Sequence, residues 1–211
     1  MKFRKKIEII GLLFFIFLVF IILWKNWVYG RDKVYHKISL PFDDYFHGEG
    51  NWKYQWGEFI VKNNSLQIRT PSAFITLEGT SHWKDYSYTL YLGEANTQSI
   101  FLTARVTNMS YVACKYKNDS VSIISVENEK EKEINYISFV SDKYRYSKNS
   151  NLTINVLEDR IRCFVNGNPI LQAKNLIIPS YGGIGVRAWS EETYPSSLKI
   201  KRIGVTKFNG D

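Results

Sequence analysis

Four side chains from three alternating segments combine aromatic rings with guanidinium groups. In each segment one parity is apolar and predicts a core face. The opposite parity carries Arg105 in SIFLTARV, Tyr111 in SYVACKYK, and Arg187 and Trp189 in GIGVRAW. Aromatic rings stack on the C–H faces of sugars, and arginine forks donate hydrogen bonds to hydroxyl or carboxylate oxygens. The four residues therefore predict a groove for an acidic or hydroxyl-rich glycan.

The same residue types also have a purely structural interpretation. Aromatic and arginine side chains form cross-strand pairs that stabilise sheets. In that case Arg105 and Arg187 would pair with acids such as Asp85 or Glu158 and would only hold the sheet together. The sequence alone leaves both interpretations open.

The segments that must position these residues are short and bounded by turn residues. Alternation of this kind predicts antiparallel strands. Thirteen such strands require two packed sheets, so the predicted fold class is all-β. They span residues 57–63, 65–70, 73–79, 85–94, 99–107, 110–118, 120–128, 134–142, 151–159, 160–167, 168–174, 182–189 and 197–207.

The N-terminus predicts a membrane anchor. Ile9 to Trp24 carries no charge, and apolar character resumes after Lys25 as far as Tyr29, which is long enough to cross a bilayer. A cleaved signal peptide is the alternative, but no small-residue cleavage site follows the apolar run. The basic residues before the helix favour a cytoplasmic N-terminus. The predicted organisation is a cytoplasmic tail (1–6), a transmembrane α-helix (7–29), a tether (30–40) and an extracytoplasmic β-sandwich (41–211).

Charge and cysteine content limit the function classes. The formal net charge is +8, but residues 1–33 hold seven basic and two acidic residues, which leaves 21 basic and 18 acidic residues in the remainder. This small surplus and the lack of a recognition motif argue against a nucleic-acid partner. The three histidines are scattered and predict no metal site. Cys114 and Cys163 share the parity of core residues, so both should point into the sandwich, as a disulfide or as two buried thiols.

The order of the motifs resembles the concanavalin A-like lectin/glucanase superfamily, and more narrowly its laminin G-like and 3-keto-disaccharide hydrolase branches. The similar segments are PFDDYF, NWKYQWGEFIVKNNSLQI, HWKDYSYTLYL, ARV followed by SYV, LTINVLEDRIRCFVNGNPI, and GGIGVRAW. The resemblance covers about residues 41–207 and implies a jelly-roll sandwich. Arg105 and Tyr111 fall where these domains have F-R-V and tyrosine positions. Some of the domains that the chain resembles hold a structural calcium ion near their N-terminal strand, where this sequence has Asp43, Asp44 and Glu49; no cofactor is otherwise expected.

Fold does not carry function by itself. Glucanases of this kind have an E-x-D-x-(x)-E strand, which places two carboxylates beside the glycosidic bond that is cleaved. The sequence lacks this motif. The acidic run Glu127 to Glu133 predicts a solvated loop. We therefore expect a non-catalytic carbohydrate-binding or accessory subunit that contacts the membrane and a polysaccharide. The alternatives are a 3-keto-glycoside hydrolase-type enzyme using Arg105, and a structural subunit of a membrane complex.

Overall fold

A computed structural model describes residues 36–48, 50–108, 110–139, 145–174, 176–191 and 197–208. The predicted cytoplasmic tail and transmembrane helix, and tether residues 30–35, lie outside these ranges. Among the residues that are described, no helix is long and apolar enough to span a membrane.

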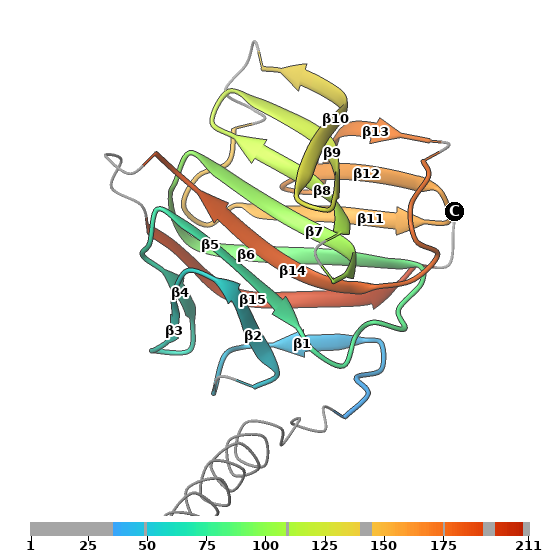
Figure 1. Ribbon diagram of the computed structural model, residues 1–211. Helices are drawn as coiled ribbons and strands as arrows, with labels where there is room; N and C mark the ends of the chain where they lie inside the picture. Colours follow the sequence, from blue (N-terminus) through green and yellow to red (C-terminus); the bar gives the residue numbers. More distant parts are fainter. Residues whose placement is uncertain are drawn as a thin grey trace, which may run out of the picture. The chain divides into compact units, whose positions relative to one another are not determined.

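The described chain forms two antiparallel sheets that pack as the layers of a sandwich (Figure 1). Sheet A has the order β13 (Asn168–Ala173), β12 (Arg160–Val165), β11 (Asn151–Leu157), β6 (Tyr86–Asn96), β15 (Ser197–Lys207), β4 (Leu66–Ile68) and β3 (Phe59–Val61), and β1 (Phe42–Asp44) also pairs with β15. Sheet B has the order β10 (Lys130–Ser138), β9 (Ser120–Glu127), β8 (Ser110–Lys117), β7 (Ser99–Thr107), β14 (Gly183–Trp189), β5 (Ser72–Leu77) and β2 (Trp52–Trp56). The all-β, two-sheet prediction is confirmed.

The structure differs from the predicted strands in two places. β1 and β2 were not predicted, because neither segment alternates clearly enough to stand out. The acidic run does not form a loop throughout: β10 begins at Lys130 and pairs with β9. The loop prediction was wrong there because charged residues are compatible with an edge strand that is exposed to water.

Alternating residues of both sheets meet in one core, and a disulfide crosses it. Cys114 in β8 and Cys163 in β12 are fully buried and bonded, with their Cα atoms 5.8 Å apart. The prediction that both point into the sandwich is confirmed. The open choice between disulfide and thiols is decided in favour of the disulfide, which joins sheet B to sheet A.

The segment 36–40 packs on the sandwich rather than hanging free of it. The Ile38 amide donates to the Gly79 carbonyl (3.0 Å), and the Trp83 indole donates to the Ile38 carbonyl (2.8 Å). Gly79 has φ +82°, and an added Cβ would lie 2.4 Å from the His36 carbonyl oxygen. The glycine is therefore required where the chain joins the sandwich.

Strand directions place several loops beside this segment. β6 and β14 begin there, and β11, β13 and β15 end there, as their registers show. We call this the His36 end; it carries the segments 78–85, 158–159 and 174–182. The opposite end, which we call the far end, carries β3 and β4, because Leu198 pairs with both Ile68 and Ala95 near the last residues of β6.

Candidate functional site

The outer face of sheet B carries a row of large side chains, one from each of five neighbouring strands. Strand register places Trp56 opposite Phe74, Phe74 opposite Arg187, Arg187 opposite Phe101, and Phe101 opposite Lys115. Residues directly opposite each other on one face are close enough to contact. The row therefore consists of three aromatic rings and two basic groups across β2, β5, β14, β7 and β8.

Arg187 is the centre of this row. Its guanidinium carbon lies 4.6 Å from the Phe101 ring centroid and 5.7 Å from that of Trp56. Its Nη1 donates a 3.0 Å hydrogen bond to the hydroxyl of Tyr111, whose ring lies 5.2 Å from that of Phe74. The guanidinium thus lies within cation–π distance of both rings.

A pocket opens beside this arginine. It has a volume of about 310 Å³ and is lined by Trp56, Tyr111, Val126, Glu129 and Arg187; we call it the Arg187 pocket. A separate, larger hollow of about 560 Å³ lies nearer the His36 end and is lined in part by Gln55, Thr76 and Asn108. Thr76 lies on the same side of β5 as Phe74, so both hollows lie on the outer face of sheet B.

The charges on this face are nearly balanced. Glu131 lies 2.5 Å from the Lys115 ammonium and 4.0 Å from Arg187 Nη1, so one carboxylate serves two cations. Glu129 adds a second carboxylate at the pocket. Burial raises the pKa of the Tyr111 hydroxyl, and the positive charge of Arg187 partly offsets this. The phenol is therefore neutral at physiological pH and able to donate a hydrogen bond.

Three buried polar atoms of this face find no hydrogen-bond partner within the described part of the chain. They are Nε of Arg187, Oγ of Ser99 and Oγ1 of Thr103. Ser99 and Thr103 share the parity of Phe101 in β7 and hence the same outer face. An unsatisfied buried polar group costs about 1–3 kcal/mol, so a hydrogen bond with water or a ligand would stabilise each of these atoms.

Trp189 extends the aromatic surface along β14. It lies two residues beyond Arg187 on the same side of the strand and is 37% exposed. Its register partner is Ser72, whose hydroxyl accepts a 3.3 Å hydrogen bond from the Trp56 indole. Trp56 and Trp189 therefore flank one serine.

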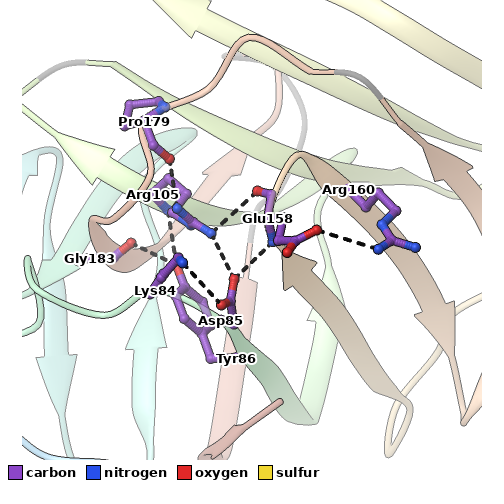
Figure 2. Close-up of polar contacts among 8 residues, drawn as sticks. All are labelled: Lys84, Asp85, Tyr86, Arg105, Glu158, Arg160, Pro179 and Gly183. Atoms are coloured by element: carbon purple, nitrogen blue, oxygen red, sulfur yellow. Dashed lines mark hydrogen bonds and ion pairs between the residues drawn. The ribbon is translucent and has the colours of Figure 1, made fainter. Parts of the chain in front are cut away.

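Arg105 does not belong to this face. It lies at a β-bulge between Ala104 and Thr107 with φ +54°, and its side chain is fully buried. Figure 2 shows its guanidinium among oxygen atoms at the His36 end: Nη1 donates to the Pro179 carbonyl (2.7 Å), and Nη2 lies 3.4 Å from Asp85 Oδ1 and 3.5 Å from the Glu158 carbonyl. Burial lowers the pKa of Arg105, and the neighbouring Tyr86 and Asp85 oppose this shift.

The structure thus brings three of the four predicted residues to one face: Tyr111, Arg187 and Trp189. Arg105 makes the structural contacts that the sequence offered as an alternative, with Asp85 and with the backbone of Glu158. Sequence reasoning missed Trp56, Phe101 and Glu131. Trp56 follows an irregularity in β2 between Tyr54 and Trp56, which hides its face, whereas the parity of Phe101 was visible in β7.

The described acids near the first strand, Asp43 and Asp44, accept hydrogen bonds from other parts of the chain. Asp43 Oδ1 accepts two hydrogen bonds from Arg202, and both Asp44 oxygens accept hydrogen bonds, from the Phe46 amide and the Trp52 indole. Glu49 lies outside the described residues. In the part of the chain that is described, no three acidic, histidine or cysteine side chains are grouped to hold a metal ion.

Two face-to-face antiparallel sheets of this strand order, with a hollow on the outer face of one, define a concanavalin A-like jelly roll. No protein-family model matches the sequence. No curated protein matches it either.

Solved structures with the same fold include a carbohydrate-binding module, a glucanase and a domain with bound Man3GlcNAc. The carbohydrate-binding module CBM66 from Bacillus subtilis is 14% identical over 72% of this chain and 94% of that chain, with a TM-score of 0.57. A β-1,3-1,4-glucanase (lichenase) derived from a mouse hindgut metagenome is 12% identical over 79% and 99%, with a TM-score of 0.60. The VIP36 exoplasmic/lumenal domain, in a Ca²⁺/Man3GlcNAc-bound form, is 11% identical over 78% and 87%, with a TM-score of 0.57. At these identities the likeness establishes the fold.

Proposed function

We propose that this protein is a membrane-anchored, extracytoplasmic carbohydrate-binding module whose ligand lies on the outer face of sheet B. The observation that carries the proposal is the Arg187 pocket, where an arginine, a neutral phenol and a tryptophan converge. Stacking surfaces and a small number of oriented polar groups are what a sugar site requires. Carbohydrate-binding modules and lectins with the same fold support this class of ligand.

The ligand that fits this face best is hydroxyl-rich and neutral. The sequence allowed an acidic glycan, on the argument that Arg105 and Arg187 both make the face positive. Arg105 lies elsewhere, and Glu131 already neutralises part of the charge of Lys115 and Arg187. A carboxylate-bearing sugar would meet Glu129 and Glu131 as like charges, which disfavours binding.

The contacts of Arg105 weigh against the enzyme alternative. That alternative assigned the chemistry to Arg105, but its terminal nitrogens contact Pro179, Asp85 and Glu158, and its side chain is inaccessible. In these contacts the Arg105 guanidinium holds loops together. The binding function therefore remains the better supported one.

The binding proposal is tested by titrating neutral and uronic-acid oligosaccharides into the full chain in detergent or nanodiscs. Tryptophan fluorescence is recorded at each step of the titration. Trp56 lines the pocket and Trp189 lies beside it, so a bound sugar should change the emission. We expect a neutral oligosaccharide to bind more tightly than the uronic acid of the same length. A panel in which no sugar changes the fluorescence and none binds by calorimetry would reject the proposal.

The anchor is tested separately. We expect the protein to resist alkaline extraction from membranes, and protease added to intact cells to digest the sandwich while sparing the first residues. A soluble mature protein that lacks residues 1–30 would reject the anchor and leave the glycan proposal standing.

A further inference from the structure

The loop 176–182 at the His36 end exposes two large apolar side chains. Ile177 is 103% exposed and Tyr181 is 61% exposed, whereas their neighbours Leu176 and Ile178 pack against the core. Alternation along an extended segment turns Ile177 outward as long as Leu176 and Ile178 stay buried. The exposure of Ile177 is therefore a result of how the loop is fixed.

Three hydrogen bonds hold this loop in place. The Leu176 amide donates to the Asp159 carbonyl (3.1 Å), Arg105 donates to the Pro179 carbonyl (2.7 Å), and the Gly182 amide donates to the Trp83 carbonyl (3.0 Å). Figure 2 shows the middle contact. A loop pinned at its start, middle and end presents its exposed side chains in a fixed arrangement, as an interaction surface requires.

The same loop lies beside the point where the chain joins the sandwich. Trp83, which accepts from Gly182, donates its indole hydrogen to Ile38. Desolvation lowers the pKa of the His82 imidazole, and the positive charge of Lys37 lowers it further. Exposed lysines lie on the segments beside the loop, at Lys37, Lys84 and Lys174. Acids lie there too: Glu158 is paired with Arg160 at 3.6 Å, Asp85 lies 4.0 Å from Lys84, and Asp159 lies beside Lys84.

Chain length limits how far this end can lie from a membrane. Six residues, 30–35, lie between Tyr29, the last residue of the predicted anchor, and His36, so the chain takes seven steps from one to the other. An extended chain spans at most about 3.3–3.6 Å per residue, so His36 lies within about 25 Å of the point where the anchor leaves the bilayer.

We propose that the His36 end is a lipid-contacting surface, on which Ile177 and Tyr181 insert into the bilayer interface and the neighbouring lysines contact anionic headgroups. Tyrosine favours the interface because its ring is apolar and its hydroxyl is polar, and lysines are attracted to anionic lipid. The inference rests on the proposed anchor. Under this proposal the sandwich keeps one orientation relative to the membrane.

The test uses the full chain in nanodiscs of phosphatidylglycerol and doxyl-labelled phosphatidylcholine. The native cysteines are bonded to each other, so Ile177→Cys can be labelled selectively with an NBD fluorophore. The matched control is Ile60→Cys, an isoleucine that is 48% exposed on β3 at the far end. We expect loss of NBD emission by doxyl quenching and protection from iodide at position 177, and the reverse at position 60.

Two results would overturn the inference. One is a label at position 177 that iodide quenches as strongly as at position 60. The other is a label protected from both quenchers, which would indicate a protein contact such as a second copy of the chain. A protein that fails to insert into nanodiscs overturns the anchor together with this inference. Arg187→Ala in the same nanodiscs should lose glycan binding without changing either label, which separates failure of the orientation from failure of the binding proposal.

Discussion

Arg187 in β14 donates a 3.0 Å hydrogen bond to the hydroxyl of Tyr111 in β8, although β7 lies between these two strands. The bond passes over the outer face of sheet B, where the guanidinium covers the Phe101 ring of the intervening strand. Three strands are thereby joined by side chains as well as by their backbones. This hydrogen bond orders the side chains at the Arg187 pocket in the absence of ligand. The entropic cost of ordering them on binding is therefore avoided.

Replacing Arg187 with alanine should weaken glycan binding. The lost charged hydrogen bonds correspond to about 1–3 kcal/mol, or roughly a tenfold to hundredfold rise in Kd. Isothermal titration calorimetry with the best neutral oligosaccharide measures the change.

Arg202→Ala is the matched control for that experiment. Arg202 also pairs with an acid, Asp43, and also contacts two aromatic rings, Tyr45 and Tyr91, but it lies on the outer face of sheet A. We expect its substitution to leave the Kd unchanged. Equal weakening by both variants would show that the assignment to sheet B is wrong.

Arg105→Met should destabilise the sandwich without changing the affinity for glycan. Arg105 is fully buried, and its removal deprives the Pro179 carbonyl and Asp85 of a charged hydrogen bond, which costs about 1–3 kcal/mol. Asp85 is the partner left behind. The free energy of unfolding from urea titration is the measurement, and the Asp85→Asn/Arg105→Met double variant should lose less than the sum of the two single variants. If the Arg105→Met protein had normal stability but no longer bound sugar, Arg105 would be shown to belong to the binding site.

Loss of the Cys114–Cys163 bond should lower stability markedly. Removal of a native disulfide from a small extracytoplasmic domain typically costs about 2–5 kcal/mol. Urea unfolding of the Cys114→Ala/Cys163→Ala variant, compared with the native protein with and without reductant, checks this value. Reductant should destabilise the native protein and have no effect on the variant; a response of the variant to reductant would contradict the assignment.

Stability should decline at alkaline pH because of buried tyrosines. Burial raises the pKa of Tyr86, Tyr88 and Tyr116 above the ordinary value of 10.0. The unfolded chain then releases these protons first, so the stabilisation is complete below pH 10.0 and is lost as the pH rises toward the folded-state values. Unfolding midpoints measured from neutral pH upward should fall beyond 10.0.

Tyr116→Phe isolates one of these residues. Its hydroxyl donates to the Thr153 and Phe164 carbonyls, so the variant should be less stable at neutral pH. Its stability should nevertheless fall less steeply above pH 10.0, because it has one fewer buried phenol to ionise. A slope identical to that of the native protein would show that Tyr116 contributes nothing to the alkaline transition.

Strand parity predicted most of this structure from the sequence. It placed Cys114 and Cys163 in the core, and it placed Tyr111, Arg187 and Trp189 on the opposite face, because residues along a regular strand alternate sides. Parity depends on an uninterrupted strand. At Arg105 a bulge with positive φ breaks the alternation, and the side chain turns to Asp85 at the end of the sandwich instead.

Pairing between strands was the part that local patterns could not supply. Arg187 meets Phe101 and Trp56 through the order β7–β14–β5–β2, in which β14 inserts between strands that are far from it in the chain. Glu131 was read as part of a solvated loop because its neighbours are charged, yet pairing of β10 with β9 brings it to Lys115. Such contacts depend on sheet order, which no single segment encodes.

The disulfide also determines what a single backbone cut can do to this molecule. Cys114 and Cys163 are 49 residues apart, and β9, β10 and β11 lie between them. A protease that cleaves once anywhere in this stretch produces two polypeptides that remain one covalent molecule, since the bond still links β8 to β12. The fragments of the nicked protein separate only after reduction, so the sandwich can be opened at the β9–β10 edge without shedding either sheet.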